Sequence, residues 1–374
     1  MRMNRHEFLS RSAAVAGSAF ILPFIPEREA SSAAERFRME FQLKRLTLKH
    51  TWTISRNSSA FKDNVFVTLS AAGVTGYGEA APNVRYSESA ESTLEYLAKA
   101  KPLVEASDPW MFHDLGLKIH SLGEGQTAAK CAVDIAMMDW LGKKLGVPLY
   151  RLWGLDPTRI PLTTFSIGID TPEVMQQKVR EAAAFPVLKI KVGTADDRRN
   201  VEAIRRVTDK PLRVDANEGW KTKEQALENI RWLATQGVEF IEQPLPSSML
   251  EETGWLKERV EMPIIADESV KRAGDIPRLA QAFDGINIKL MKSGGLQEAL
   301  RMIAMARSLN LKIMLGCMIE SSVAIAAGAH LAPLTDWIDL DGNLLISNDP
   351  YKGLIIHNGR WALSANPGLG VQPI

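Results

Sequence analysis

LKIKVG, residues 188–193, opens a series of short apolar stretches, each of which contains or ends at a charged residue. From Lys191 to Lys289 the charges follow one another at steps of 24, 27, 25 and 22 residues, about the length of one strand–helix unit. A chain that repeats this unit places its charges at the same level of successive strands, around a single site. The charged residues of the series are Lys189, Lys191, Asp215, Glu242, Asp267, Lys289, Asp339 and Asp341.

The second half of the chain alternates strand-like and helix-like patterns. In residues 295–308, for example, Leu296, Leu300 and Ile303 recur at three- and four-residue steps, which is typical of an amphipathic helix. Strands that alternate with helices run parallel, and eight of them predict a closed barrel. No helical pattern follows the last strand, so the predicted fold is α/β, a modified TIM barrel of the form (β/α)7β. The expected strands cover residues 162–168, 187–192, 212–216, 239–243, 264–268, 286–290, 312–316 and 337–341.

The N-terminal part of the chain shows a different, α+β pattern. It predicts a separate domain at residues 35–155, followed by the barrel at residues 156–354, with the junction between Gly154 and Pro161. Pro102 is expected to end the first helix of this domain. The expected elements are three antiparallel strands and two helices, at residues 41–50, 64–70, 76–79, 90–100 and 127–145.

Charge and cysteine content exclude several classes of function. The chain has 374 residues, a formal net charge of +1 and no basic block to cover a phosphate backbone, which argues against nucleic-acid binding. Cys131 and Cys317 lie far apart and form neither a disulfide framework nor a metal-ligand spacing. Both are expected to be buried small hydrophobic residues. The sequence leaves the oligomeric state, including a homo-oligomer, open.

The first 34 residues resemble an export signal. Arg2, Arg5 and Arg11 precede the apolar stretch at residues 13–25, and a segment rich in Ser and Ala follows. The segment NRHEFLS resembles a twin-arginine signal with His6 in place of the second arginine. We therefore expect export to the periplasm, the alternative being an N-terminal arm on a cytoplasmic protein. No other stretch is long and apolar enough to span a membrane.

Three acidic residues of the series predict a metal site. Asp215, Glu242 and Asp267 lie at the ends of three successive predicted strands, where a barrel carries its working residues. Taken alone, Asp215 or Asp267 can equally be the N-cap of a helix. A set of three carboxylates suits a hard cation such as Mg²⁺, and the lack of His or Cys among them argues against zinc.

The lysines of the series predict acid–base chemistry. Lys189 and Lys191 are two residues apart on a strand and project to the same side, either into the barrel or towards solvent. Inside the barrel, desolvation and the nearby like charge are expected to lower the pKa of both lysines towards that of a general base. Lys289 lies four strands later, across the barrel. Two such bases can remove a proton next to a carboxylate from one face and return it to the other, while Mg²⁺ stabilises the developing charge.

These motifs resemble the enolase superfamily, and within it the subgroup of the muconate lactonising enzymes. The matching motifs are the Lys-x-Lys pair, DANEGW, EQP, ADES and KLMKSGG. The resemblance implies eight barrel strands, seven helices and a capping domain completed by residues 355–374. Asp339 and Asp341 make the chain similar to dipeptide epimerases, in which such a pair holds the ammonium group of the substrate; the alternative is that they cap the final loop. Gly342 and Asn343 stand where that family usually has a proline nearby.

The resemblance also implies a role for each site residue. Arg56 is similar to an arginine that contacts the Glu side chain in L-Ala-D/L-Glu epimerases, the alternative being an exposed, solvated arginine. Arg85 and Tyr86 lie in a second capping loop from which they can reach the substrate. The other implied roles are catalytic bases for Lys191 and Lys289, Mg²⁺ ligands for Asp215, Glu242 and Asp267, orientation of those ligands for Asn217 and Glu268, and substrate binding for Lys189, Asp339, Asp341, Ser166 and Met318.

The implied function is an isomerase reaction that depends on Mg²⁺. A small dipeptide, L-Ala-D/L-Glu from cell-wall peptide, would be epimerised by proton transfer at the α-carbon of its C-terminal residue. The alternatives are another reaction of the superfamily, such as a cycloisomerase or o-succinylbenzoate synthase-like reaction, an epimerase for non-acidic dipeptides, and a non-catalytic binding protein on an enzyme scaffold.

Overall fold

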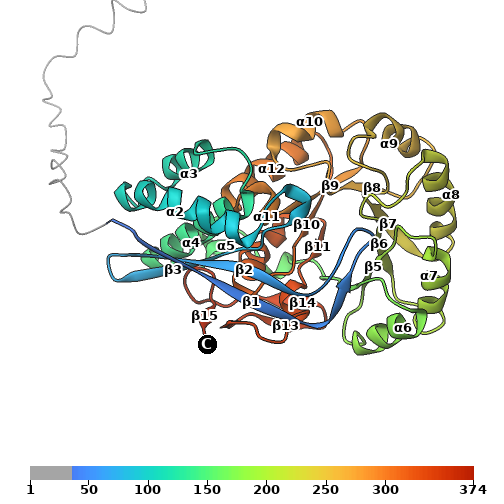
Figure 1. Ribbon diagram of the computed structural model, residues 1–374, viewed down its shortest axis with the longest axis horizontal. Helices are drawn as coiled ribbons and strands as arrows, with labels where there is room; N and C mark the ends of the chain where they lie inside the picture. Colours follow the sequence, from blue (N-terminus) through green and yellow to red (C-terminus); the bar gives the residue numbers. More distant parts are fainter. Residues whose placement is uncertain (1–35) are drawn as a thin grey trace, which may run out of the picture. The chain divides into compact units, whose positions relative to one another are not determined.

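The computed structural model describes residues 36–374, and the predicted export signal lies outside these residues. Two parts follow one another along this segment: a three-stranded sheet with its helices, and a ring of parallel strands with helices outside it (Figure 1). Between residues 36 and 374, no helix has the length and apolar character needed to cross a membrane.

Eight parallel strands form a barrel in which spatial neighbours are also neighbours in the sequence. A parallel bridge between Thr163 and Ile338 joins the beginning of this series to its last strand and closes the ring. Every predicted run overlaps one of the strands, and β7 and β9 begin one residue earlier than expected, so the predicted α/β barrel is confirmed. The strands are β4 (Phe165–Ile167), β5 (Leu188–Lys191), β6 (Leu212–Asp215), β7 (Val238–Glu242), β8 (Ile264–Ala266), β9 (Gly285–Lys289), β10 (Lys312–Gly316) and β11 (Trp337–Asp339).

Each crossover between barrel strands contains a helix. Helices α6, α8 and α13 begin after Thr171, Thr222 and Ser321, whose hydroxyls accept a hydrogen bond from the first turn. Figure 1 shows α6 to α9 following one another around the outside of β5 to β8. As predicted, no α-helix follows β11, where only the 3₁₀ turn η5 (Gly342–Leu344) is present. The crossover elements are α6 (Pro172–Glu181), α7 (Asp197–Arg205), α8 (Lys223–Ala234), α9 (Leu250–Lys257), η3 (Ala273–Asp275), α10 (Ile276–Leu279), α11 (Leu290–Ser293), α12 (Leu296–Ser308), α13 (Ser322–Leu331) and η4 (Ala332–Leu334).

The N-terminal part is an antiparallel sheet covered by helices. Pro102 does not end α2, contrary to the prediction, and the helix continues to Ala106. The reason is packing: Leu97, Ala100 and Val104 form a fully buried face on both sides of the proline, and this outweighs the one backbone hydrogen bond that proline removes. The elements are β1 (Arg38–Thr53), β2 (Ser58–Ala71), β3 (Val74–Ala80), η1 (Val84–Tyr86), α2 (Ala90–Ala106), α3 (Phe112–Ser121), α4 (Thr127–Leu145), α5 (Leu149–Leu152) and η2 (Pro157–Arg159).

Helix α4 contacts both the sheet and the C-terminal tail. A Cβ atom at Gly78 of β3 would lie 1.9 Å from the carbonyl oxygen of Ala132, so this close approach of strand and helix requires glycine. In the tail, the backbone N–H of Leu369 donates to Asp139 at 2.8 Å. The predicted domain boundaries remain predictions. The tail contains β12 (Tyr351–Lys352) paired with β15 (Gln372–Pro373), and β13 (Ile355–His357) paired with β14 (Arg360–Ala362).

Candidate active site

Three carboxylates meet at the carboxyl ends of β6, β7 and β8. Asp215 pairs in register with Lys191 on one side and with Glu242 on the other, so these residues lie at one level of the barrel. Asp267 is the residue after the end of β8. One oxygen atom of each carboxylate lies within 4.8 Å of the others, and all three residues are buried. The fold thus brings together the three residues predicted as metal ligands.

The atoms around this cluster fit a hard cation. The amide of Asn217 donates to Asp215 Oδ2 at 3.1 Å, and the amide of Asn287 donates to Glu242 Oε1 at 2.7 Å. Glu242 Oε2 is buried and accepts no hydrogen bond from residues 36–374, although the Lys189 ammonium lies 2.8 Å away. Carboxylates that are held in place in this way, one of them with a buried oxygen that accepts no hydrogen bond, form a donor set that suits Mg²⁺.

Lys189 lies among the acidic residues and not in a cationic pocket. Its Nζ atom is 2.6 Å from Asp339, 2.8 Å from Glu242 and 3.4 Å from Asp215, and its side chain is fully buried. Burial alone would lower the pKa of Lys189, but these three carboxylates raise it well above its usual value. Burial alone would likewise lower the pKa of Lys289, but Asp267 and Glu242 raise it well above its usual value. The predicted lowering is therefore wrong for Lys189, because the neighbouring acids outweigh like charges and desolvation.

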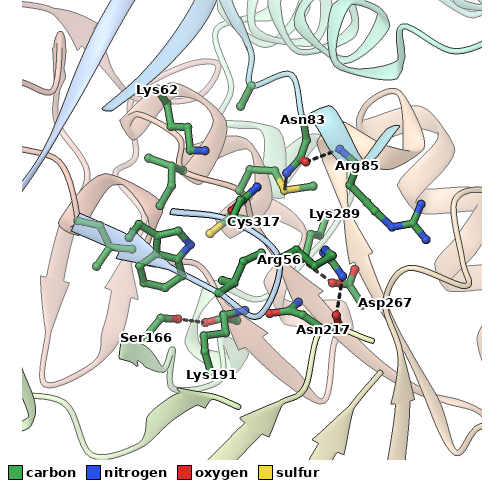
Figure 2. A pocket seen from close by; sticks show the side chains of 18 of the residues that line it. Arg56, Lys62, Asn83, Arg85, Ser166, Lys191, Asn217, Asp267, Lys289 and Cys317 are labelled. Carbon is green, nitrogen blue, oxygen red and sulfur yellow. Dashed lines mark hydrogen bonds and ion pairs between the residues drawn. The ribbon is translucent and has the colours of Figure 1, made fainter. Parts of the chain in front are cut away.

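Lys191 and Lys289 enter the pocket from different sides (Figure 2). They belong to β5 and β9, which lie four strands apart in an eight-stranded ring. Lys191 Nζ is 2.6 Å from Asp215, and Lys289 Nζ is 2.8 Å from Asp267. Lys189 and Lys191 are both buried, so the solvent-facing alternative for the Lys-x-Lys pair is wrong. Two amines that face one cavity from opposite strands can reach the two faces of a single carbon atom.

Asp339 and Asp341 form an anionic corner beside the first barrel strand. The hydroxyls of Thr164 and Ser166 donate to Asp339, and the backbone N–H of Ser166 donates to Asp341 at 2.6 Å. Asp341 precedes η5, but its side chain makes no capping bond there, so the loop-capping alternative is not what the geometry shows. Both carboxylates line the same pocket as the two lysines. A cationic group of a ligand would be paired here with two acids.

Gly342, which departs from the sequence pattern of the dipeptide epimerases, lies where there is no room for a side chain. A Cβ atom at Gly342 would lie 2.5 Å from the carbonyl oxygen of Met318 and 2.8 Å from the backbone nitrogen of Glu320. The loop after β11 therefore packs against the loop after β10 too closely for a side chain at this position. The next residue, Asn343, donates to the hydroxyl of Ser322 at 3.1 Å. These contacts hold the loop that carries Asp341.

Two arginines from the N-terminal part lie over the mouth of the barrel (Figure 2). Arg56, in the turn between β1 and β2, is 2.7 Å from Glu268 and 3.1 Å from Glu218, and it donates to the carbonyl of Asn217 at 2.6 Å. Arg85 in η1 binds both oxygens of Glu218, at 2.8 and 2.9 Å. The four side chains form one network that connects the capping loops to the barrel. Arg56 is therefore not a solvated surface residue.

The remaining predicted residues occupy the pocket or its support. Tyr86 and Met318 line the pocket. Asn217 and Glu268 contact each other at 3.3 Å, next to Asp215 and Asp267. Of the two cysteines, Cys131 is buried as predicted, but Cys317 is partly exposed and lines the pocket, because it follows β10 at the open end of the barrel.

Two residues near the metal cluster were not singled out from the sequence. Lys292 donates to the backbone and side-chain oxygens of Asp267, and Asn287 holds Glu242. Asn287 lies two residues before Lys289 on β9, so strand alternation alone places both side chains on the inner face. Lys292 has no such signal, because it belongs to the short helix α11 and its position depends on that turn.

Comparison with known families decides the classification. A family described as "Enolase C-terminal domain-like" matches residues 173–374, and one described as "Mandelate racemase / muconate lactonizing enzyme, N-terminal domain" matches residues 41–154. The chain belongs to the enolase superfamily. This agrees with the resemblance inferred from the sequence motifs, and the superfamily accounts for the pairing of the barrel with a separate N-terminal sheet.

Among its relatives, this superfamily member is similar to several dipeptide epimerases. It is 42% identical to the L-Ala-D/L-Glu epimerase of Bacteroides thetaiotaomicron, over 99% of the chain and 100% of that protein. The L-Ala-D/L-Glu epimerase of Bacillus subtilis, solved with a substrate ligand, superposes with a TM-score of 0.85 at 30% identity, covering 90% and 98% of the two chains. A dipeptide epimerase of Enterococcus faecalis, solved with Mg and L-Leu-L-Tyr, has a TM-score of 0.85 at 33% identity, covering 90% and 99%.

Proposed function

We propose that this protein is a Mg²⁺-dependent dipeptide epimerase that acts on L-Ala-D/L-Glu. The observation that carries the proposal is the position of Asp339 and Asp341, which line one pocket together with Lys191 and Lys289. The acidic pair binds a cationic group and the lysines address a carbon atom between them. A dipeptide zwitterion has both features, and a relative at 42% identity is an L-Ala-D/L-Glu epimerase.

Each group of side chains has a separate role in the proposed reaction. Asp339 and Asp341 bind the substrate ammonium and set the position of the peptide. One of Lys191 and Lys289 removes the α-proton of the C-terminal residue, and the other donates a proton to the opposite face. When bound by Asp215, Glu242 and Asp267, Mg²⁺ supplies positive charge that stabilises the negative charge developing on the substrate carboxylate. Burial of the site keeps water from competing with these contacts.

The alternatives differ from this proposal in what the acidic pair would do. A cycloisomerase or o-succinylbenzoate synthase-like reaction has no ammonium group to place beside Asp339 and Asp341. An epimerase for non-acidic dipeptides uses the pair in the same way and differs only at the other end of the pocket. The similarity to an enzyme solved with L-Leu-L-Tyr keeps this alternative in the substrate test.

The reaction is tested by incubating the enzyme and Mg²⁺ with a dipeptide library in heavy water. We expect deuterium to enter the α-carbon of the C-terminal residue, fastest for L-Ala-Glu, because that proton is the one exchanged between the lysines. Mass spectrometry reports the uptake and chiral chromatography reports the new epimer. Uptake by no dipeptide would contradict the proposed reaction, and faster uptake by aliphatic or basic dipeptides would contradict the proposed substrate.

The pH dependence of kcat/KM should show the ionisation of Asp341. Burial, followed by the nearby Asp339 carboxylate, raises the pKa of Asp341 to about 7, so the carboxylate is charged only above that pH. A dipeptide ammonium loses its proton near pH 8. We therefore expect kcat/KM for L-Ala-L-Glu to fall as the pH drops below about 7, and again above about 8.

The variant Asp341→Asn separates this ionisation from others. It should lower kcat/KM at neutral pH by about tenfold, as expected for a weakened charged hydrogen bond. It should also remove the decrease below pH 7. An unchanged acid limb in this variant would assign the decrease to another group.

The proposal extends to the location of the enzyme. We propose export to the periplasm, where the enzyme would act on dipeptides from cell-wall peptide, with the sequence pattern of residues 1–34 as support. Cell fractionation should place the activity in the periplasm, and activity that stays in the cytoplasm would contradict export.

A further inference from the structure

The cationic side chains that line the pocket differ in one respect, which is their pairing. Lys191 is paired with Asp215, Lys289 with Asp267, and both arginines with Glu218 or Glu268. Lys62 lines the same pocket, and among residues 36–374 its amine has neither a hydrogen bond nor an ion pair. Figure 2 shows the amine of Lys62 directed towards the cavity.

Strand geometry explains why Lys62 points inwards. It lies on β2, two residues before Asn64, and residues two apart on a strand share one face. Asn64 is buried on that face, where its amide donates to the carbonyl of Ile319 in the loop after β10 at 3.0 Å. The side chain of Lys62 is thus on the barrel side of the sheet. Its burial lowers the pKa of Lys62, which is the effect of an ammonium that lacks a counter-charge.

The network of Arg56 and Arg85 with two glutamates has no net charge. Arg56 and Arg85 carry two positive charges, and Glu218 and Glu268 carry two negative charges in direct contact with them. Arg56 still has free N–H donors, because three of its five are used, but its charge is shared with two carboxylates. Among the cationic side chains that line the pocket, the positive charge without a counter-charge is therefore that of Lys62.

We propose that Lys62 binds the side-chain carboxylate of the substrate's C-terminal residue and thereby makes the enzyme select acidic dipeptides; this rests on the function proposed above. Lys62 lines the same pocket as Asp339, Asp341, Lys191 and Lys289, so a dipeptide bound by those four residues has one further unpaired cation in its pocket. A partly buried, unpaired ammonium binds an anion well, since the anion restores the charge balance that burial disturbs.

The test compares two substrates that differ only in charge, L-Ala-L-Glu and L-Ala-L-Gln. Lys62→Met keeps the unbranched apolar part of the side chain and removes the charged amine. It should lower kcat/KM for L-Ala-L-Glu by about 30-fold, the factor for one charge-assisted hydrogen bond, and change that for L-Ala-L-Gln by less than about twofold. Lys62→Arg should retain most of the preference. As a control, Lys44→Met on β1, outside the pocket, should leave both values unchanged.

The experiment distinguishes a failure of the proposed function from a failure of the proposed role of Lys62. If wild-type enzyme exchanges no dipeptide, the proposed function is wrong whatever Lys62 does. If wild-type enzyme is active and Lys62→Met lowers both substrates equally, or neither, Lys62 does not read the side chain. Activity on L-Ala-L-Gln also shows that the variant is folded, so loss of stability cannot be mistaken for loss of selectivity.

Discussion

Replacing Lys191 or Lys289 with glutamine should lower kcat for interconversion of L-Ala-L-Glu and L-Ala-D-Glu by about a thousandfold, the usual contribution of a general acid–base group. Epimerisation needs both lysines, because one removes the proton and the other delivers it. The two residues lie on strands β5 and β9 at opposite sides of the ring, so neither amine can serve both faces of the α-carbon.

Loss of one base should not abolish every half-reaction. Each variant retains a lysine on one face and should still exchange the α-proton of one epimer with deuterium from heavy water, without forming the other epimer. The two variants should therefore show opposite epimer preferences in exchange. This pattern also assigns each lysine to its epimer. A single-lysine variant that interconverts the epimers at the wild-type rate would show that the proposed two-base reaction is wrong.

Removal of divalent cations should abolish activity, and Mg²⁺ should restore it. Asp215, Glu242 and Asp267 provide three buried carboxylates within 4.8 Å of one another, and the reaction requires compensation for charge on the substrate carboxylate. The variant Glu242→Gln should lower kcat by about a thousandfold or more, because it removes a ligand charge and weakens the pairing of Lys189. Activity that persists unchanged in EDTA would contradict this role of the cluster.

A measurement of stability tests the metal site independently of activity. A cation that binds only the folded state stabilises it by about 2.7 kcal/mol at a hundredfold excess over Kd, which raises the Tm by several degrees. We expect this shift for wild-type enzyme and its loss in Glu242→Gln. Glu239→Gln is the matched control, since Glu239 lies on the same strand but pairs with Arg213 at the other end of the barrel strands. It should retain the Mg²⁺-induced shift.

The barrel was predictable because its local and global signals agree. Each strand is an apolar run bounded by a helical pattern, and each charged residue lies at the carboxyl end of its strand, so spacing alone indicated that Asp215, Glu242 and Asp267 converge. The sheet of the N-terminal part followed from alternation. Pro102 was misread because a local helix-ending signal was outweighed by packing between distant segments.

The electrostatic state of the site could not be predicted from local sequence. The pKa of Lys189 depends on Asp339, which is 150 residues away in the chain and is brought within 2.6 Å by closure of the barrel. Likewise, Glu218 meets Arg56 and Arg85 across 162 and 133 residues. Strand periodicity indicates which face a side chain occupies, but the partner of a charge is a property of the closed fold.

The contacts of Glu218 have a consequence for exchanging parts among relatives. This single side chain from the barrel holds arginines from two separate loops of the N-terminal part. A chimera that joined this barrel to the N-terminal segment of another family member would therefore keep Glu218 but could lack the arginines that pair with it. Loop grafts intended to change selectivity would have to transfer residue 218 together with residues 56 and 85, because these three side chains form ion pairs with one another.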